Sequence, residues 1–344
     1  MNKFIKRLIK NIVRKFGYEI TKIPSFPIPN IKNEINDDSS SNSSDCMVIC
    51  NNGKYQMYNE IFNKFRYLND LEWIGLLFKS VDMQVIGNKK FPGFPEENIQ
   101  IGMIGNFGKN ALYEPAHIYQ EVRRIAKQQN KTFNEKTTLL NFACGYGRHT
   151  RFYLKDIYPG NLYGSDVTHN FIDICRNTFS CDKNSDVIFD INDPFPPLKF
   201  NAETFDFVIA YSLFSHLSEK AHLAWLSEFF RILKCDGLLF LTFRQYHFLA
   251  NLGKNIGSSK ITDNYELFLL KKLGNDSTLE RFNSGEYIFN PSGGGYEMTN
   301  DFYGDTVIPT SYILSKWTEW FDIIEHYEDP SKLQQSFICL KKKM

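Results

Sequence analysis

The sequence predicts an α/β protein in which a mainly parallel β-sheet carries helices on both faces. An apolar run at 139–142 leads into a turn with two glycines and then into a short helical pattern. Strand-like and helix-like segments alternate from there to about residue 243, which is the pattern of parallel β–α–β units. With 344 residues, of which 42% are hydrophobic, the chain is long enough to bury a sizeable core.

The turn after residue 142 contains Gly145 and Gly147. Glycine lets the backbone adopt positive φ and lets a ligand approach without an intervening Cβ. A helix predicted at 148–155 would point its N-terminus at this turn, and such an end favours an electron-rich or anionic ligand. An ordinary strand–helix turn explains a glycine pair equally well, so this motif alone does not decide the function.

A second strand-like run, 161–166, ends in Asp166, nineteen residues beyond Gly147. A carboxylate at this place can accept hydrogen bonds from both hydroxyls of a ribose. A lone Asp at a strand end is more often a turn or N-cap residue, but the spacing favours contact with a nucleoside. Two ligand classes fit, a dinucleotide and S-adenosylmethionine. The dinucleotide fingerprint requires a third small residue, and this chain has Thr150 there.

The segment Asn141-x-Ala143-x-Gly145-x-Gly147 resembles motif I of the class I S-adenosylmethionine-dependent methyltransferases, usually D/E-x-G-x-G-x-G. Asn141 replaces the acid that usually holds the methionine amino end, and Ala143 replaces the first glycine. The resemblance covers about residues 110–342. It implies a Rossmann-like seven-stranded sheet with an antiparallel last strand, helices on both faces, and S-adenosyl-L-methionine as the cofactor.

The resemblance also implies which residues bind the cofactor. In the family, a polar residue just after the third strand hydrogen-bonds the adenine amino group, and Asn192 or Asp193 holds that position here. Asn and Asp are also common turn residues, which is the alternative explanation. The predicted cofactor site consists of Asn141, Ala143, Cys144, Gly145, Gly147, Asp166, Val167, Asn192, Asp193 and Tyr211.

The acceptor side of the predicted site follows the fourth strand, 205–211. Methyltransferases that act on amino groups often carry N/D-P-P-Y/F here, whereas this chain reads Tyr211-Ser-Leu-Phe214, which disfavours N-methylation of nucleic acid. The chain looks more like the small-molecule and sugar methyltransferases, many of which have a His shortly after this strand. His216 is therefore the candidate catalytic base for an acceptor hydroxyl. The alternative is that His216 caps the helix predicted at 218–234.

These residues predict transfer of a methyl group to a sugar, a glycan or another small hydroxyl-bearing acceptor by direct displacement. Two alternatives stay open. A catalytically silent S-adenosylmethionine-binding module is favoured by Asn141 and Ala143. A nicotinamide-dependent oxidoreductase would use the same kind of sheet, but Thr150 and the lack of a Tyr-x-x-x-Lys pair after the fourth strand argue against it.

Composition narrows the partners. The net charge of +1 gives no general electrostatic attraction to nucleic acid. The seven cysteines include no C-x-x-C pair, which indicates reduced thiols in a cytoplasmic protein, without a disulfide framework or a metal site. Aromatic residues make up 15% of the chain, which suits a packed core and also a sugar-stacking pocket.

The N-terminal part of the chain is predicted to consist of three segments. Residues 1–22 form a basic amphipathic helix, which is neither a signal peptide nor a membrane span. Attachment to an anionic inner-membrane surface and docking on a protein are both compatible with it. Residues 23–53 read as a flexible polar linker. Helical patterns at 58–78 and 111–128 predict a helical cap over residues 54–135, which would shape the acceptor pocket or simply pack on the sheet.

The remaining residues, 136–344, form the predicted methyltransferase domain. Residues 248–310 do not fit the β–α repeat and are expected to be an insertion. It contains a glycine triplet, 293–295, flanked by aromatic residues, which favours a lid or an acceptor loop over a plain surface insertion. Two strand-like runs near the C-terminus, 321–327 and 335–340, predict a terminal hairpin.

Overall fold

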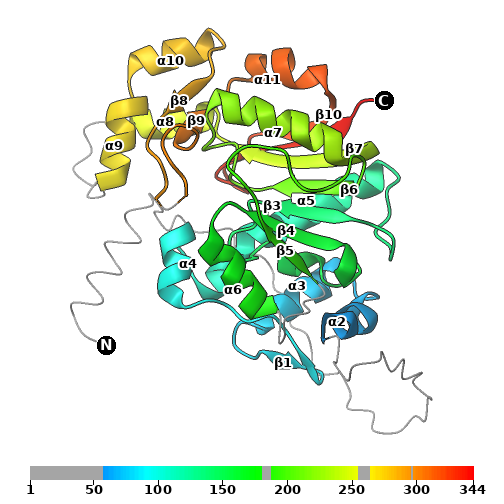
Figure 1. Ribbon diagram of the computed structural model, residues 1–344. Coiled ribbons are helices and arrows are strands. Elements are labelled where there is room, and N and C mark those ends of the chain that lie inside the picture. Colours follow the sequence, from blue (N-terminus) through cyan, green and yellow to red (C-terminus); the bar gives the residue numbers. More distant parts are fainter. Residues whose placement is uncertain (1–56, 180–186, 255–263, 296) are drawn as a thin grey trace, which may run out of the picture.

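The computed structural model describes residues 57–179, 187–254, 264–295 and 297–344. The predicted amphipathic helix 1–22 and linker 23–53 lie outside the described residues and stay predictions. The described chain is organised around one central sheet with helices on both faces (Figure 1). The N-terminal helices precede the sheet in the chain, and residues 246–307 are inserted before the last two strands of the sheet.

The central sheet has seven strands in the order β10-β11-β7-β6-β3-β4-β5. Strands β3 to β7 pair in parallel, and β11 pairs antiparallel with both β7 and β10. The predicted fold class, including the antiparallel last strand, is therefore confirmed. The bounds are Leu139–Phe142 (β3), Leu162–Asp166 (β4), Ile188–Ile191 (β5), Phe205–Ala210 (β6), Leu233–Phe243 (β7), Phe321–Tyr327 (β10) and Ser336–Lys342 (β11).

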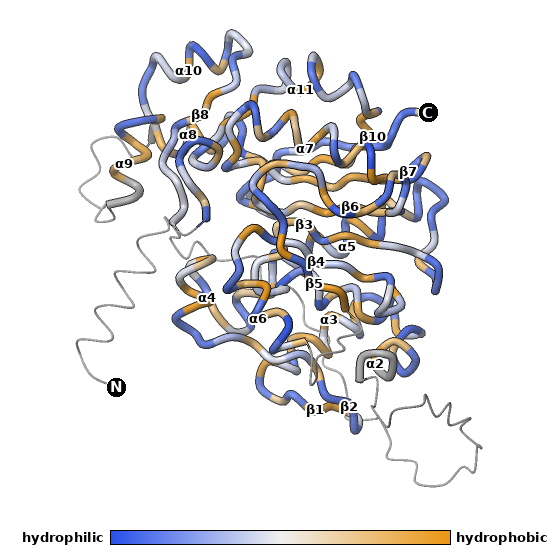
Figure 2. Tube along the Cα trace, viewed as in Figure 1, coloured by the Kyte–Doolittle hydropathy of each residue, from blue (hydrophilic) through white to orange (hydrophobic). Residues whose placement is uncertain are grey.

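The alternation of side chains along the strands divides the core into two layers. One layer contains Phe207 and Ile209 of β6 with the helices α5, Tyr113–Gln128, and α6, His169–Phe179. The other contains Val208 of the same strand with α7, Glu219–Ile232, and α11, Thr310–Lys316. Figure 2 shows the hydrophobic residues concentrated along the strands between these helices. The parallel strands are thus buried on both faces.

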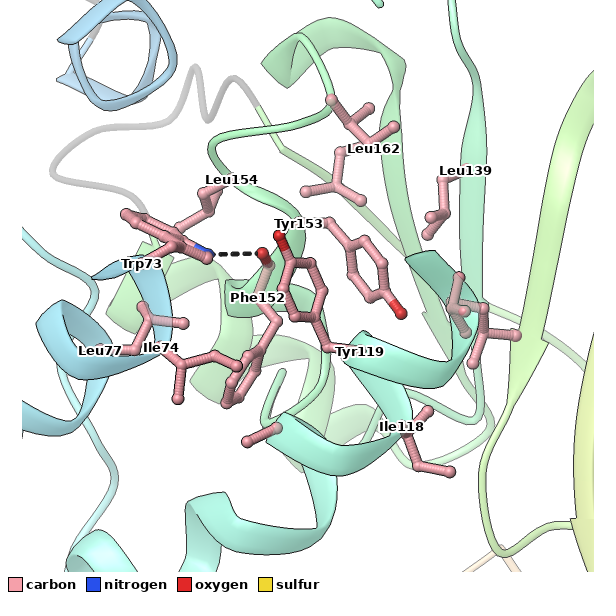
Figure 3. Close-up of a cluster of buried hydrophobic side chains, with 14 of the residues drawn as sticks. Trp73, Ile74, Leu77, Ile118, Tyr119, Leu139, Phe152, Tyr153, Leu154 and Leu162 are labelled. Atoms are coloured by element: carbon pink, nitrogen blue, oxygen red, sulfur yellow. Dashed lines mark hydrogen bonds between the residues drawn. The ribbon is translucent and has the colours of Figure 1, made fainter. Parts of the chain in front are cut away.

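The helical region before the sheet packs on the first of these layers. Its elements are α2 (Met57–Phe65), α3 (Asp70–Lys79), the short hairpin of β1 (Val85–Ile86) and β2 (Lys89–Lys90), α4 (Glu97–Ile104), the 3₁₀ helix η1 (Gly108–Leu112) and α5. Trp73 of α3 is fully buried and donates its indole N–H to the carbonyl of Phe152 at 2.7 Å (Figure 3). The grouping of residues 54–135 as a cap stays a prediction.

The single helix predicted at 58–78 is wrong, because the chain forms two helices there. Asn69 stands at the N-cap of α3, where its side chain accepts a hydrogen bond from the backbone N–H of Glu72. The Glu72 carboxylate accepts the backbone N–H of Asn69 in return. This reciprocal capping box favours the start of a new helix over continuation of α2.

A buried charge network joins α3 and α5 to the segment after β3. Lys155 is 1% exposed, and its Nζ lies 2.8 Å from Asp156 and 3.2 Å from Asp70. Arg123 contacts both acids, each at 3.3 Å, and Tyr119 donates its hydroxyl to Asp156 at 2.6 Å. Because each buried charge has an opposite partner, the network holds the N-terminal helices in a fixed place beside the sheet.

The predicted insertion forms a separate layer beyond β7. It contains α8 (Tyr246–Lys254), α9 (Asn264–Leu273), α10 (Asp276–Asn283) and the strands β8 (Ile288–Asn290) and β9 (Asp305–Val307). The two strands pair antiparallel and share a small apolar cluster with α8 and α9. In Figure 1 this layer lies on the same side of the molecule as α4.

Candidate active site

The glycine turn after β3 has the backbone conformation that its sequence predicts. Gly145 has φ of +54° and Gly147 has φ of +77°. Ala143 adopts φ of +54° as well, so the alanine accepts the left-handed conformation usually left to glycine at this place. The substitution of the first glycine of the motif therefore leaves the course of the turn intact.

Gly145 lies directly below the side chain of Met103 from α4. A Cβ added to Gly145 would sit 2.0 Å from the Met103 Cε and 2.9 Å from its Sδ. A residue with a Cβ would therefore require the end of the Met103 side chain to move. The N-terminal helices thus contribute the Met103 side chain, which fills the space directly above Gly145.

Asp166 ties the end of β4 to the glycine turn. Its carboxylate accepts the backbone N–H of Gly145 at 2.8 Å and that of Thr168 at 2.9 Å. Burial raises the pKa of Asp166, the hydrogen bonds from Thr168 and Gly145 lower it, and the nearby charge of Glu297 raises it. Each carboxylate oxygen keeps lone-pair capacity for a further donor. Val167 follows and is half-buried.

Asn141 faces the inside of the fold. It is 2% exposed, and its side-chain amide donates to the Thr150 hydroxyl at 2.8 Å. Thr150 opens η2, the 3₁₀ helix Thr150–Tyr153. The α-helix predicted at 148–155 is therefore wrong, because the chain makes only this short helix and turns there. Where the family usually has a negative charge, this chain has a neutral contact.

Two thiols line the inner side of the turn. Cys144 is buried, and Cys175 of α6 donates to the carbonyl of Gly145 at 3.1 Å. Burial is the largest of the effects that raise the pKa of Cys144 well above its ordinary value. A buried thiol with a high pKa is a packing group and not a nucleophile.

The polar residues after β5 lie beside Asp166. The backbone N–H of Asn192 donates to the Asp166 carbonyl at 3.1 Å. The Asn192 side chain accepts from the Ser165 hydroxyl at 2.7 Å and donates to the carbonyl of Asp193 at 2.8 Å. The Asp193 side chain is exposed. Because Asn192 is engaged at both ends of its amide, Asp193 is the better placed of the two to meet a ligand.

Tyr211 follows β6, and its ring lies at a tilt of 31° against a histidine that the sequence analysis did not single out. The ring of His149 lies 4.4 Å from that of Tyr211, is buried, and has an Nε2 without a hydrogen-bond partner in the described structure. Burial and the charge of Arg148 lower the pKa of His149 well below its ordinary value. The signal for His149 was its place directly after the glycine turn.

His216 is half-buried after β6, against the return of the insertion. Its Nδ1 lies 2.8 Å from the Gly304 carbonyl, and its ring stacks parallel on Tyr303 with 4.9 Å between centroids. A carbonyl partner places the proton on Nδ1, so Nε2 carries the free lone pair. Burial, aided by Arg244, lowers the pKa of His216 to about 4, although Asp305 and Gly304 raise it. The ring is therefore neutral at pH 7.

The helix-capping alternative for His216 is wrong. Ser218 occupies the N-cap of α7, and its hydroxyl accepts the backbone N–H of Ala221. The catalytic interpretation of His216 stays a prediction.

An ion pair holds the insertion against β7 beside His216. Arg244 Nη1 lies 2.8 Å from Asp305 Oδ1, and Ser292 donates to the other Asp305 oxygen at 2.9 Å. Asp305 is fully buried. The sequence analysis did not identify this pair, because its members stand in segments with no shared pattern.

One comparison with known protein families agrees with the glycine turn, Asp166 and the strand order of the sheet. A family model described as a methyltransferase domain matches residues 139–237, which run from β3 into β7. Residues 139–237 are a methyltransferase domain of the class I S-adenosylmethionine-dependent type. No curated protein matches this chain.

Several solved structures resemble the methyltransferase at low identity. A Pyrococcus horikoshii protein shares 18% identity over 66% of this chain and 90% of that chain, with a TM-score of 0.43. An S-adenosylmethionine-dependent methyltransferase from Clostridium acetobutylicum shares 12% over 67% and 92%, with a TM-score of 0.45. Magnesium protoporphyrin IX methyltransferase from Synechocystis, which has bound S-adenosylhomocysteine, shares 13% over 69% and 88%, with a TM-score of 0.43.

The residues present fit an adenosyl group. The buried Asp166 carboxylate keeps lone pairs for hydroxyl donors such as those of a ribose. In the described residues, no group of three or more His, Cys, Asp or Glu side chains is placed to hold a metal ion. Across the same ranges, no helix is long and apolar enough to cross a membrane.

Proposed function

We propose that this methyltransferase transfers a methyl group to a hydroxyl oxygen of a sugar, a glycan or another small acceptor. The observation that carries the proposal is the neutral ring of His216, stacked on Tyr303 at the carboxyl end of β6. An imidazole Nε2 with a free lone pair suits a hydroxyl donor. The paired rings offer a flat surface of the kind on which sugars stack.

We also propose a role for each of the cofactor-binding residues. Asp166 would accept the ribose hydroxyls, Asp193 or Asn192 would meet the adenine, and Tyr211 would line the methionine end together with the turn, 141–147. S-adenosylmethionine supplies a methyl group on a sulfonium, which is a good leaving group. Positioning therefore supplies most of the rate enhancement, and His216 orients the hydroxyl and receives its proton.

The test is methyl transfer from labelled S-adenosylmethionine to a panel of sugars, glycans and small alcohols, beside a matched panel of amines. We expect an O-methyl ether as the product. His216→Gln should lower kcat about tenfold to a hundredfold, the low end of what a positioned acid–base group contributes. His247→Gln is the matched control, because His247 is exposed on α8.

Three outcomes would contradict the proposal. Transfer to amines alone would assign a different acceptor class. Binding of S-adenosylhomocysteine without turnover on any acceptor would favour the silent module. Binding of a nicotinamide dinucleotide in place of S-adenosylhomocysteine would favour an oxidoreductase.

A further inference from the structure

Arg148, the residue directly after Gly147 of the glycine turn, joins this turn to α5 and to the end of β6. Its Nη1 donates to the carbonyl of Ala111 at 3.0 Å and lies 3.4 Å from Oε2 of Glu114, in the first turn of α5. Its guanidinium carbon lies 5.4 Å from the centre of the Tyr211 ring. These contacts place the Glu114 carboxylate one guanidinium group away from Tyr211.

The ion pair of Arg148 and Glu114 leaves both groups able to bind a further charge. Its distance of 3.4 Å exceeds the roughly 2.7–2.9 Å of a charge-assisted hydrogen bond. The Glu114 side chain is 22% exposed, so its carboxylate oxygens stay accessible to a ligand. A guanidinium has five N–H donors, and a carboxylate accepts several hydrogen bonds. A ligand with charges of both signs can therefore bind to the pair without displacing either side chain from its place.

The methionine end of S-adenosylmethionine is such a ligand, because one carbon carries both an ammonium and a carboxylate group. Beside an arginine and a glutamate, these two groups bind in one sense only, with the ammonium on Glu114 and the carboxylate on Arg148. Each charge then lies next to charges of opposite sign. Since Arg148 is buried, these contacts are stronger than they would be in bulk water.

The glycine turn itself supplies no acid for the ammonium group. Residues 139–147 contain neither Asp nor Glu. Asn141 is neutral and 2% exposed, and its amide donates to the Thr150 hydroxyl inside the fold. A negative charge for the ammonium group has to come from another segment, and Glu114 reaches the turn through its contact with Arg148.

We propose that Glu114 of α5 binds the ammonium group of the cofactor and supplies the negative charge that Asn141 does not provide. Glu114 is then a cofactor-binding residue contributed by the N-terminal helices and not by the glycine turn. The inference rests on the proposed placement of the methionine end beside Tyr211. It is independent of the acceptor, so it can fail while the proposed transfer to a hydroxyl oxygen stands.

The test is isothermal titration of the full chain with three ligands that share the adenosine and the thioether. S-adenosylhomocysteine carries the whole amino acid, its deaminated analogue lacks the ammonium group alone, and methylthioadenosine lacks both charged groups. Glu114→Gln should weaken S-adenosylhomocysteine about tenfold, as expected for the loss of one charge-assisted contact. It should leave methylthioadenosine unchanged. It should not weaken the deaminated analogue, whose carboxylate then meets one repelling charge less.

Glu121→Gln is the matched control, because Glu121 stands on the same helix, pairs with Arg124 at 2.6 Å and has a similar side-chain exposure of 18%. It should leave all three affinities unchanged. Both ligand-free variants should keep a thermal unfolding midpoint close to that of the unchanged protein, since partly exposed ion pairs contribute little to stability. An equal loss for all three ligands in Glu114→Gln would assign Glu114 a structural role and overturn the proposal. An unchanged affinity for S-adenosylhomocysteine would overturn it as well.

Discussion

The cofactor side and the acceptor side of the site are held together by contacts of different range. On the cofactor side, Asn141 bonds Thr150, nine residues away, and Gly145 bonds Asp166, 21 residues away. Most of these contacts involve backbone groups of one turn and of adjacent parallel strands. The glycine turn and Asp166 are therefore fixed mainly within one β–α–β unit, and Met103 of α4 packs on them from outside it.

The acceptor side depends on contacts between distant segments. The Gly304 carbonyl meets His216 across 88 residues, and Asp305 meets Arg244 across 61. The difference teaches that the glycine turn is fixed by contacts close in sequence, while His216 is fixed by contacts with the insertion. Changes on one side should leave the other largely intact, and the following variants test that separation.

The largest effect is expected from Asp305→Ala on the acceptor side. It removes the carboxylate that Arg244 contacts, and breaking a buried ion pair typically costs about 3–5 kcal/mol. We expect a large loss in unfolding free energy by urea titration and a raised acceptor KM. Affinity for S-adenosylhomocysteine should change less than about threefold.

Glu286→Ala is the matched control, because Glu286 pairs with Arg281 on the surface of the same insertion. An exposed pair contributes at most about 1 kcal/mol. If Asp305→Ala abolishes S-adenosylhomocysteine binding in protein that remains folded, the two sides are not separable and the comparison is wrong.

The next effect is expected from Gly145→Ala on the cofactor side. An L-residue in the left-handed region is strained by about 1–2 kcal/mol, and the new Cβ meets Met103. We expect cofactor affinity by titration to fall at least about tenfold. Gly145→Ala combined with Met103→Ala should recover only the part of the loss that is steric.

Gly160→Ala serves as the control for this variant, because its backbone has no positive φ and its nearest neighbour for a Cβ lies 4.0 Å away. It should bind the cofactor normally. Full recovery in the double variant would show that backbone strain plays no part, and unchanged affinity in Gly145→Ala would show that the turn does not contact the cofactor.

The smallest effect is a pH dependence that both sides share. His149 on the cofactor side and His216 on the acceptor side have a lowered pKa, to about 4 for His216, because burial disfavours the charged ring. In the unfolded chain they take up protons near pH 6.5. The unfolded state therefore binds more protons below pH 6.5, and the unfolding free energy falls as the pH falls toward about 4.

The loss should be about 1 kcal/mol for each histidine at pH 5.5, one unit below the unfolded pKa. Urea unfolding at pH 7.0, 6.0 and 5.5 measures it. His149→Gln and His216→Gln should each reduce the dependence of the unfolding free energy on pH. Burial lowers the pKa of His222 to about 3, so both variants should keep part of the pH dependence of the unfolding free energy. A stability independent of pH across this range would refute the assignment.

The sequence predicted the parts of the fold that local pattern determines. The fourth strand was expected at 205–211 and is Phe205–Ala210, and the helix expected at 218–234 is Glu219–Ile232. Apolar periodicity and turn residues determine these elements without help from distant residues. The same local rules explain one error, since the capping ability of Asn69 was visible in the sequence but was overlooked.

Much of the candidate site could not be predicted in the same way. Asp166 and the glycine turn follow from spacing, but Gly304 and Asp305 reach His216 and Arg244 only because β8 and β9 pair and their loop folds back on residues 215–218. Short strands within a long insertion leave little pattern in the sequence. His149 was missed for another reason, because its role depends on the stacking partner Tyr211 across the sheet.

The Gly304 carbonyl decides which ring nitrogen of His216 carries the proton. A loop inserted between β7 and β10 therefore selects the tautomer of a histidine that follows β6. If the insertion moved away from the sheet, His216 would lose this partner, and its ring could turn and exchange tautomers freely.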